Sequence, residues 1–126
     1  MNTSFGLKPH IREVVYFVAD IDAAAQWYGT LFGAAVEYEN PRYAFIRLPE
    51  VTLGFHPADA KNASSTGGAA VYWQVERLDA ALAHLEATGA VLLRGPGTTD
   101  LGEQVCLLCD PFGNLLGLNQ PATTAG

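Results

Sequence analysis

The sequence predicts an α+β fold built from two copies of one βαβββ module. Two segments of this 126-residue chain, 18–25 and 75–82, resemble each other at an offset of 57 residues. Each segment follows a run rich in β-branched and aromatic residues and leads into an apolar stripe with helical spacing. Three short strand-like runs then follow each predicted helix. Both halves therefore share one order of elements, which indicates an internal repeat.

The first half contains the clearer helix signals. A strand is predicted at 14–18, and a helix begins at Asp20, which suits an N-cap. The helix ends at Gly33, which suits a left-handed C-cap. Three further strands are predicted at 35–38, 43–48 and 51–56.

The second half repeats this order after a connector rich in Ala, Asn, Ser and Gly. A strand is predicted at 71–75, and a helix runs from the segment 75–82 to Gly89. Its three further strands are predicted at 91–93, 104–108 and 115–119. We interpret residues 1–126 as a single domain with module 1 at about 11–57, a connector at 58–68 and module 2 at about 69–120.

Composition narrows the possible partners. Apolar residues make up 49% of the chain and charged residues 16%, which excludes an intrinsically disordered class. The net charge of −6 and the absence of a basic stripe argue against nucleic acid. The sequence contains neither an apolar run of about 20 residues nor a signal-peptide pattern, so we expect no membrane partner and a cytoplasmic location.

Cys106 and Cys109 form a C-x-x-C pattern inside an apolar run that is typical of a strand. A redox C-x-x-C motif usually opens a helix, and a structural zinc site needs a second cysteine or histidine pair. We therefore expect two buried thiols, and their redox role stays open.

Strand alternation assigns side chains to two faces in the first module. A two-residue turn at 49–50 pairs Leu48 with Val51, which makes one face of the hairpin entirely apolar. The other face is mixed, and it carries Tyr43, Phe45, Arg47, Thr52, Gly54 and His56. An apolar face suits packing against a helix, and a mixed face suits contact with solvent or a ligand.

The second module is predicted to have a comparable mixed face with Tyr72, Gln74, Gly117 and Asn119. A four-residue loop at 110–113 would add three residues of the preceding strand to this face, namely Gln104, Cys106 and Leu108.

Three motifs carry a resemblance to a known family. They are the strand from Glu13 to Asp20 that leads into a helix, the pattern Tyr28-x-x-Leu31-Phe32-Gly33, and the segment Asp110-Pro111-Phe112-Gly113-Asn114. Together they resemble the vicinal oxygen chelate superfamily, which includes glyoxalase I, the fosfomycin and bleomycin resistance proteins and the extradiol dioxygenases. The resemblance implies a curled mixed sheet around a cup, helices on the outer face, and a homodimer.

The resemblance also implies where a metal would bind. Metal-dependent members hold a divalent ion with four side chains, and the corresponding positions here are Glu13, Gly54, Ala70 and Gly117. Glycine and alanine carry no donor atom, so we expect no metal and no other cofactor. We also expect these small residues to leave the floor of the cup empty.

Our leading hypothesis is a metal-independent binding protein of the bleomycin-resistance type that sequesters an antibiotic or an aromatic metabolite. Its small organic ligand would lie in the cup against Glu13, Phe17, Tyr43, Phe45, Arg47, His56, Tyr72, Gln74, Gln104 and Asn119.

Two alternatives stay open. The chain could be a metal-free enzyme with isomerase or lyase-type chemistry, with Glu13 or His56 as the general base. The sequence contains no recognisable nucleophile–base pair, which favours binding over catalysis. In a purely structural interpretation, Glu13 pairs with Arg47 to stabilise the sheet and the aromatic side chains fill space.

Overall fold

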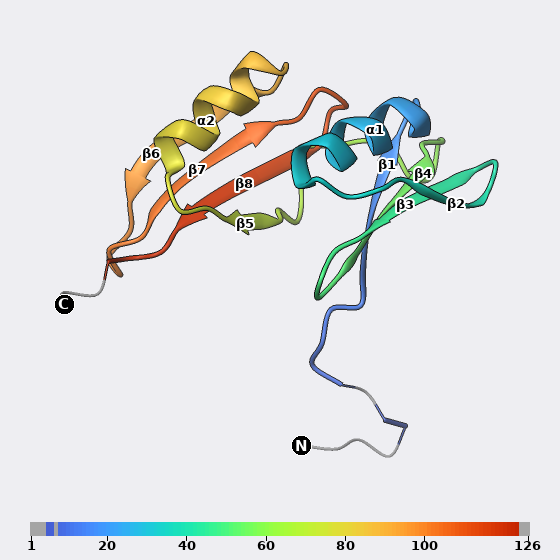
Figure 1. Cartoon of the computed structure of the whole chain (residues 1–126), viewed down its shortest axis with the longest axis horizontal. Helices are drawn as coiled ribbons and strands as arrows, with labels where there is room; N and C mark the ends of the chain where they lie inside the picture. The colour runs from blue at the N-terminus through green and yellow to red at the C-terminus, as the bar shows by residue number, and fades with distance from the viewer. Residues whose placement is uncertain (1–4, 7, 124–126) are drawn as a thin grey trace. The chain divides into compact units, whose positions relative to one another are not determined.

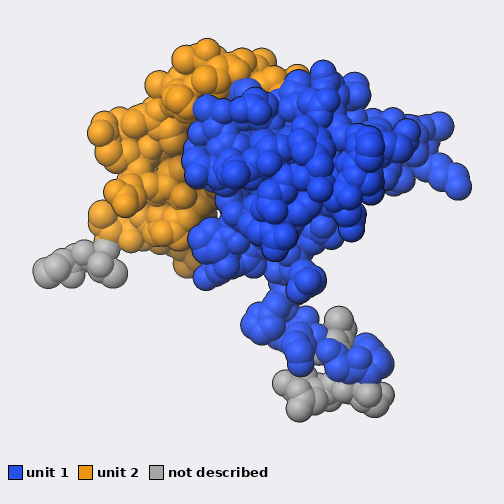
Figure 2. Space-filling model, turned by 45° about the vertical axis from the view of Figure 1, so that its right-hand side comes forward, with its two compact units in different colours: residues 1–63 blue, residues 64–126 orange. Residues whose placement is uncertain are grey.

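The computed structural model describes residues 5–6 and 8–123. The chain divides into two compact units, residues 1–63 and 64–126 (Figure 2). The boundary between them falls inside the predicted connector at 58–68. Over the described residues, neither helix has the length and apolar character that crossing a membrane would require.

Unit 1 contains a mixed sheet of four strands and one helix (Figure 1). Its elements are β1 (Glu13–Val18), α1 (Ile21–Phe32), β2 (Glu37–Asn40), β3 (Tyr43–Arg47) and β4 (Thr52–Pro57). The strand order is β1-β4-β3-β2, with β1 and β4 parallel and the other pairs antiparallel.

Unit 2 repeats this plan. Its elements are β5 (Tyr72–Gln74), α2 (Leu78–Ala87), β6 (Val91–Thr98), β7 (Gln104–Cys109) and β8 (Leu115–Gln120). The strand order is β5-β8-β7-β6, and the parallel pair is again formed by the first and last strands of the module. The predicted α+β fold of two tandem βαβββ modules is confirmed.

Helix α1 begins and ends as its sequence predicts. The Asp20 side chain accepts a hydrogen bond of 3.0 Å from the Ala23 amide, which satisfies one of the free N–H groups of the first turn. Gly33 closes the helix in the left-handed conformation, with φ of 65°. The helix packs on β3 and β4, and Tyr28 is fully buried there against the rings of Tyr16 and Phe55.

Side-chain alternation divides the sheet of unit 1 into two faces. The helix face packs against α1 and contains Ala44, Ile46, Leu53 and Phe55, all fully buried. The opposite face, which we call the open face, contains Phe45 and the residues that share its register. The pairing of Phe45 with Gly54 and of Arg47 with Thr52 confirms the predicted hairpin register.

The loop between β7 and β8 corrects one prediction. Asp110 and Asn114 are buried, and one carboxylate oxygen of Asp110 accepts hydrogen bonds from the amides of Phe112 and Asn114. Cys109 pairs with Leu115, so the loop holds five residues instead of the predicted four. Because a shift of one residue reverses every side chain of a strand, the predicted face of β7 was wrong.

The corrected register moves three predicted residues to the helix face of unit 2. Cys106 pairs with Leu118 and Leu108 with Leu116, and these four side chains are buried. Gln104 lies on the same side of β7. The open face of unit 2 instead carries Tyr72 and Gln74, which pair with Gly117 and Asn119.

Candidate functional site

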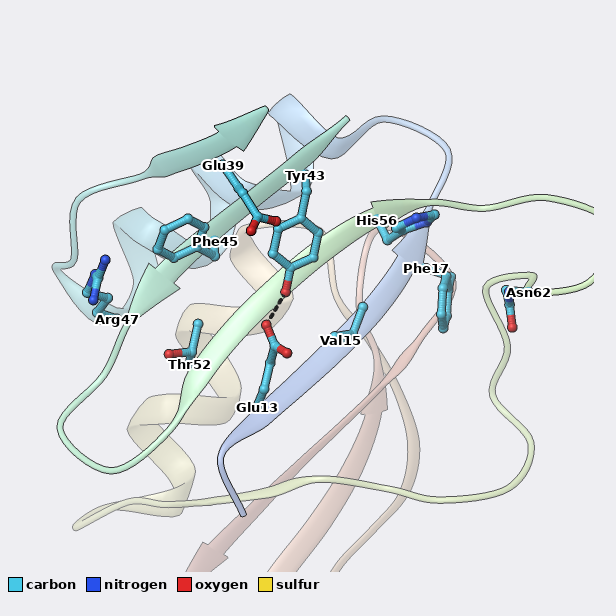
Figure 3. A pocket seen from close by; sticks show the side chains of 10 residues that line it. All are labelled: Glu13, Val15, Phe17, Glu39, Tyr43, Phe45, Arg47, Thr52, His56 and Asn62. Carbon is cyan, nitrogen blue, oxygen red and sulfur yellow. Dashed lines mark hydrogen bonds between the residues drawn. The ribbon is translucent and has the colours of Figure 1, made fainter. Parts of the chain in front are cut away.

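The open face of unit 1 contains a cavity of about 740 Å³ (Figure 3). Residues from all four strands and from the connector line it, and they are Glu13, Val15, Phe17, Glu39, Tyr43, Phe45, Arg47, Thr52, His56 and Asn62. Six of them were predicted as ligand contacts: Glu13, Phe17, Tyr43, Phe45, Arg47 and His56. The geometry brings these six together, and their role as ligand contacts stays a prediction.

Gly54 and Tyr43 define the floor of this cavity. Gly54 is buried in β4, and a Cβ atom at this position would overlap the hydroxyl group of Tyr43. The missing side chain therefore lets the phenol ring lie across the sheet. We expected from the sequence that this floor would be empty. That expectation was wrong, because the ring of Tyr43 occupies the space above the glycine.

The hydroxyl group of Tyr43 reaches across β4 to Glu13 on β1. It donates a hydrogen bond of 2.5 Å to Oε2 of the Glu13 carboxylate (Figure 3). Burial raises the pKa of Tyr43 well above its usual value, and the Glu13 hydrogen bond and the charges of Glu13 and Glu39 raise it further. Tyr43 is therefore a neutral donor throughout the physiological pH range, and it fixes the orientation of the carboxylate.

Arg47 pairs with a residue of the neighbouring strand β2. Its Nε lies 3.0 Å from Oε2 of Glu37 on β2. The Glu13–Arg47 pair of the purely structural interpretation is therefore not the pair that forms. The guanidinium group also lies over the Phe45 ring, with Cζ 5.3 Å from the ring centroid. Phe45 in turn stacks on Tyr43, with ring centroids 6.2 Å apart. These contacts line up three flat groups along β3.

His56 and Phe17 form the opposite wall. Their rings meet edge to face, with centroids 5.6 Å apart. Nδ1 of His56 lies 2.9 Å from the carbonyl oxygen of Pro57. Because a carbonyl oxygen only accepts, Nδ1 carries the proton in this bond, and Nε2 of the neutral ring is left as an acceptor.

Four residues that line the cavity were not among the predicted ligand contacts: Val15, Glu39, Thr52 and Asn62. Alternation alone places Val15 and Thr52 on this face, so those two were recoverable from the sequence. Glu39 lies in β2, which has an irregular register with β3 between Tyr38 and Asn40. Asn62 lies in a turn closed by the Asp59 carboxylate, which accepts from the Lys61 and Asn62 amides. No strand pattern predicts this position.

Unit 2 contains the remaining predicted contacts. Tyr72 is 47% exposed and lies over Gly117, where a Cβ atom would overlap its ring. Gln74 and Asn119 share this face. Gln104 does not: it lines a hollow of about 460 Å³ on the helix face together with α2 residues such as Leu82 and Glu86. The prediction that Gln104 joins the other contacts is therefore wrong, because the five-residue loop reverses β7.

The residues present do not fit the divalent metal that the fold family implies. At the two positions in unit 1, the Glu13 carboxylate accepts from Tyr43, and the Tyr43 ring covers the donorless Gly54. At the two positions in unit 2, Ala70 has no donor and Gly117 is covered by Tyr72. Across the described part of the chain, no three His, Cys, Asp or Glu side chains come together in a metal-binding group.

The two cysteines lie on β7, as predicted, and both are free thiols. Cys106 is buried, as expected, whereas Cys109 is only half-buried, so the expectation of two buried thiols was wrong for Cys109. Burial raises the pKa of both thiols, and the neighbouring charges of Glu86 and Asp110 add to the effect at Cys106 and Cys109 respectively. Neither thiol is thus activated as a nucleophile at neutral pH.

The fold and the site define a two-module α+β protein whose first sheet holds an aromatic-lined cavity on its open face. A family model described as the Glyoxalase/Bleomycin resistance protein/Dioxygenase superfamily matches residues 10–118. The chain belongs to this superfamily, which confirms the resemblance of its motifs. No curated protein matches the chain by sequence.

Solved structures of low sequence identity share the fold. A glyoxalase/bleomycin resistance protein/dioxygenase family enzyme from Burkholderia phytofirmans PsJN has a TM-score of 0.76 at 21% identity, covering 88% of this chain and 98% of its own. The antibiotic binding protein TnmS3 from Streptomyces sp. CB03234 has a TM-score of 0.71 at 23% identity, covering 91% and 98%. A lactoylglutathione lyase from Agrobacterium tumefaciens has a TM-score of 0.68 at 19% identity, covering 90% and 95%.

Proposed function

We propose that this chain is a metal-independent binding protein for a small, planar organic ligand such as an antibiotic or an aromatic metabolite. The observation that carries the proposal is the pair formed by Tyr43 and Glu13. A tyrosine ring above Gly54 replaces the side chain that a metal site would need, and its hydroxyl group engages the one carboxylate at the four metal positions.

The lining of the cavity supports an aromatic ligand. Phe17, Tyr43 and Phe45 present ring surfaces, and flat ligands gain from stacking on such rings. Glu13 is exposed on the cavity side of the Tyr43 bond and offers its remaining lone pairs to an N–H or cationic group of the ligand. A volume of about 740 Å³ lies in the range typical of small-molecule sites.

Relatives of similar fold include both a binding protein and an enzyme. We place this chain with the metal-free, bleomycin-resistance-like branch because three of the four metal positions lack donor atoms. Tyr72, Gln74 and Asn119 belong to the proposed contacts of unit 2. We also propose that the single-domain chains form a homodimer in the cytoplasm with two equivalent pockets. Light scattering of the purified protein would test the dimer.

A thermal-shift screen tests the proposal, because a ligand that binds only the native state raises its stability. We expect hits among planar aromatic compounds, with a further gain for those that carry an amine. We expect Zn²⁺, Ni²⁺ and Mn²⁺ to give no shift. A stoichiometric divalent metal that binds with Glu13-dependent affinity would contradict the proposal.

Two tyrosines of the same sheet provide a matched control. Tyr43 donates to Glu13 on the open face, and Tyr38 donates to Asp22 of α1 at 2.6 Å. Tyr43→Phe should weaken a confirmed ligand about tenfold, since it frees the Glu13 carboxylate from its fixed position. Tyr38→Phe removes an equivalent bond outside the cavity and should leave affinity unchanged.

A second candidate function rests on His56. Its Nδ1 faces the Pro57 carbonyl, so the neutral form of the ring presents Nε2 to the cavity as an acceptor, as a general base requires. Glu13 is the other candidate base. Isomerase or lyase-type turnover of a bound ligand that is lost in His56→Gln or Glu13→Gln, with binding retained, would establish catalysis in place of sequestration.

A further inference from the structure

The cavity does not end at Arg47 and Thr52. A second hollow of about 410 Å³ begins at these two residues, which line both spaces. It extends around the turn between β3 and β4 and along the segment that precedes β1, and its other lining residues are His10, Ile11, Arg12, Leu48, Pro49, Glu50 and Val51. We call this hollow the turn groove.

The charges of the two hollows differ. Both hollows share Arg47. Beyond it, the cavity carries two carboxylates near Tyr43, Glu13 and Glu39, together with His56. The turn groove instead adds Arg12 and His10 against a single carboxylate, Glu50. An elongated ligand that fills both spaces would therefore meet acidic groups at one end and basic groups at the other.

The two arginines have donors to spare. Arg47 uses its Nε for Glu37, which leaves its terminal nitrogens, and its side chain is 70% exposed. Arg12 has no ion-pair partner among residues 5–6 and 8–123. Thr52 is a backbone neighbour of both arginines, since it pairs with Arg47 on β3 and its amide bonds to the Arg12 carbonyl at 3.1 Å. All three residues line the turn groove.

We propose that the ligand carries an anionic group, a carboxylate or a phosphate, at the end that leaves the cavity, and that Arg12 and Arg47 hold this group in the turn groove. Guanidinium groups suit both anions because they offer planar, paired donors that stay charged. This inference rests on the proposed function and adds the chemistry of the ligand's second end.

Two fluorescent probes that differ only in this group test the inference: 9-aminoacridine-4-carboxylate and 9-aminoacridine-4-carboxamide. Both offer a flat ring system and an amine to the cavity. We expect the carboxylate to bind the full chain about tenfold more tightly at low salt, because charge-assisted hydrogen bonds exceed neutral ones in strength. At about 0.5 M NaCl screening should remove most of this advantage.

Substitutions test whether Arg12 and Arg47 cause the tighter binding of the carboxylate probe. Arg12→Gln and Arg47→Gln should each weaken the carboxylate several-fold, and the double variant should bind both probes equally. Arg47→Lys, which keeps the charge, should retain part of the effect. Arg42→Gln is the matched control, because Arg42 lies in the same unit and lines neither hollow.

The outcomes separate the two proposals. Equal binding of both probes by the unmodified chain, or an advantage that survives the double variant, overturns the anionic end. If Phe45→Ala still weakens both probes in that case, the proposed function stands. If neither probe binds, both proposals are contradicted.

Discussion

The two modules each cover a strand glycine with a tyrosine ring, but the rings come from different strands. In unit 1 the ring belongs to Tyr43 on β3, which reaches diagonally over Gly54 and donates to Glu13. In unit 2 the ring belongs to Tyr72 on β5, which lies directly opposite Gly117 in the parallel pair β5–β8. Ala70, at the position equivalent to Glu13, offers no acceptor.

The comparison separates two features of the module: a ring that fills the space over a glycine, and a polar site that the ring's hydroxyl group helps to form. Both rings occupy the space that a metal-binding side chain would fill. Replacing such a side chain by a ring requires only a glycine and a nearby tyrosine. A polar site additionally requires an acceptor within reach of the hydroxyl group, and Glu13 supplies it in unit 1. The two helices also differ in how much they bury. Helix α1 of unit 1 buries five residues, whereas α2 of unit 2 buries two, Leu78 and Leu85.

The largest expected effect concerns this difference between the helices. Tyr28→Ala removes a fully buried ring that contacts Tyr16, Trp27 and Phe55 and should lower the free energy of unfolding by about 4 kcal/mol. Leu85→Ala, in α2, should cost about 2–3 kcal/mol. Urea unfolding of both variants measures the difference, and a larger loss in Leu85→Ala would reverse our ranking of the two cores.

Alanine at the two glycines should have the next largest effect. Gly54→Ala and Gly117→Ala each force a ring aside, and each should cost about 1–3 kcal/mol through overpacking. Removing the ring as well, in Gly54→Ala/Tyr43→Ala and in Gly117→Ala/Tyr72→Ala, should recover part of each loss, because the paired residues are coupled. Additive losses in either pair would show that the ring is not what the new methyl group meets.

The helix starts offer a smaller, matched test. Asp20 is the N-cap residue of α1, and its side chain accepts a hydrogen bond from the first turn. The N-cap residue of α2, Arg77, makes no such side-chain bond. Instead, Oε1 of Gln120 on β8 accepts from the Leu78 amide at 2.8 Å. Asp20→Ala and Gln120→Ala should each lower stability by about 1 kcal/mol in urea unfolding. No loss in Gln120→Ala would exclude the strand as the cap of α2.

The smallest expected effect is the pH dependence of Tyr43. Its pKa in the folded chain is raised above the ordinary value of 10.0, so the unfolded chain releases this proton first as pH rises. The stability that the raised pKa contributes is fully present below pH 10 and is lost above it. Tyr43→Phe should therefore flatten the alkaline decline in stability, and spectrophotometric titration should lose a late-ionising tyrosine.

Much of the fold was predictable because its signals are local. The N-cap at Asp20, the left-handed Gly33 and the alternation along β3 and β4 each depend on a few neighbouring residues. The register of β7 was not predictable, since it depends on a loop whose length is set by the Asp110 carboxylate binding two amides. One added loop residue was enough to move Gln104 to the other face.

The site was predictable as a set of residues and not as a set of contacts. Period-two alternation identified six of its lining residues, yet the pairs Glu13–Tyr43 and Arg47–Glu37 run diagonally across strands. Such pairs depend on which rotamer the packing leaves free. For Tyr43 the missing side chain of Gly54 decides the rotamer, because the ring lies where a Cβ atom would be. That is also why the sequence led us to expect an empty floor.

The most direct test is a ¹H–¹⁵N NMR titration of the chain with 9-aminoacridine-4-carboxylate. We predict that the largest shift changes occur at the amides of Gly54 and Phe45, on the floor and wall of the cavity, and that they saturate together. Amides of Gly54 and Phe45 that stay fixed while the probe binds would contradict the claim that this cavity is the ligand site.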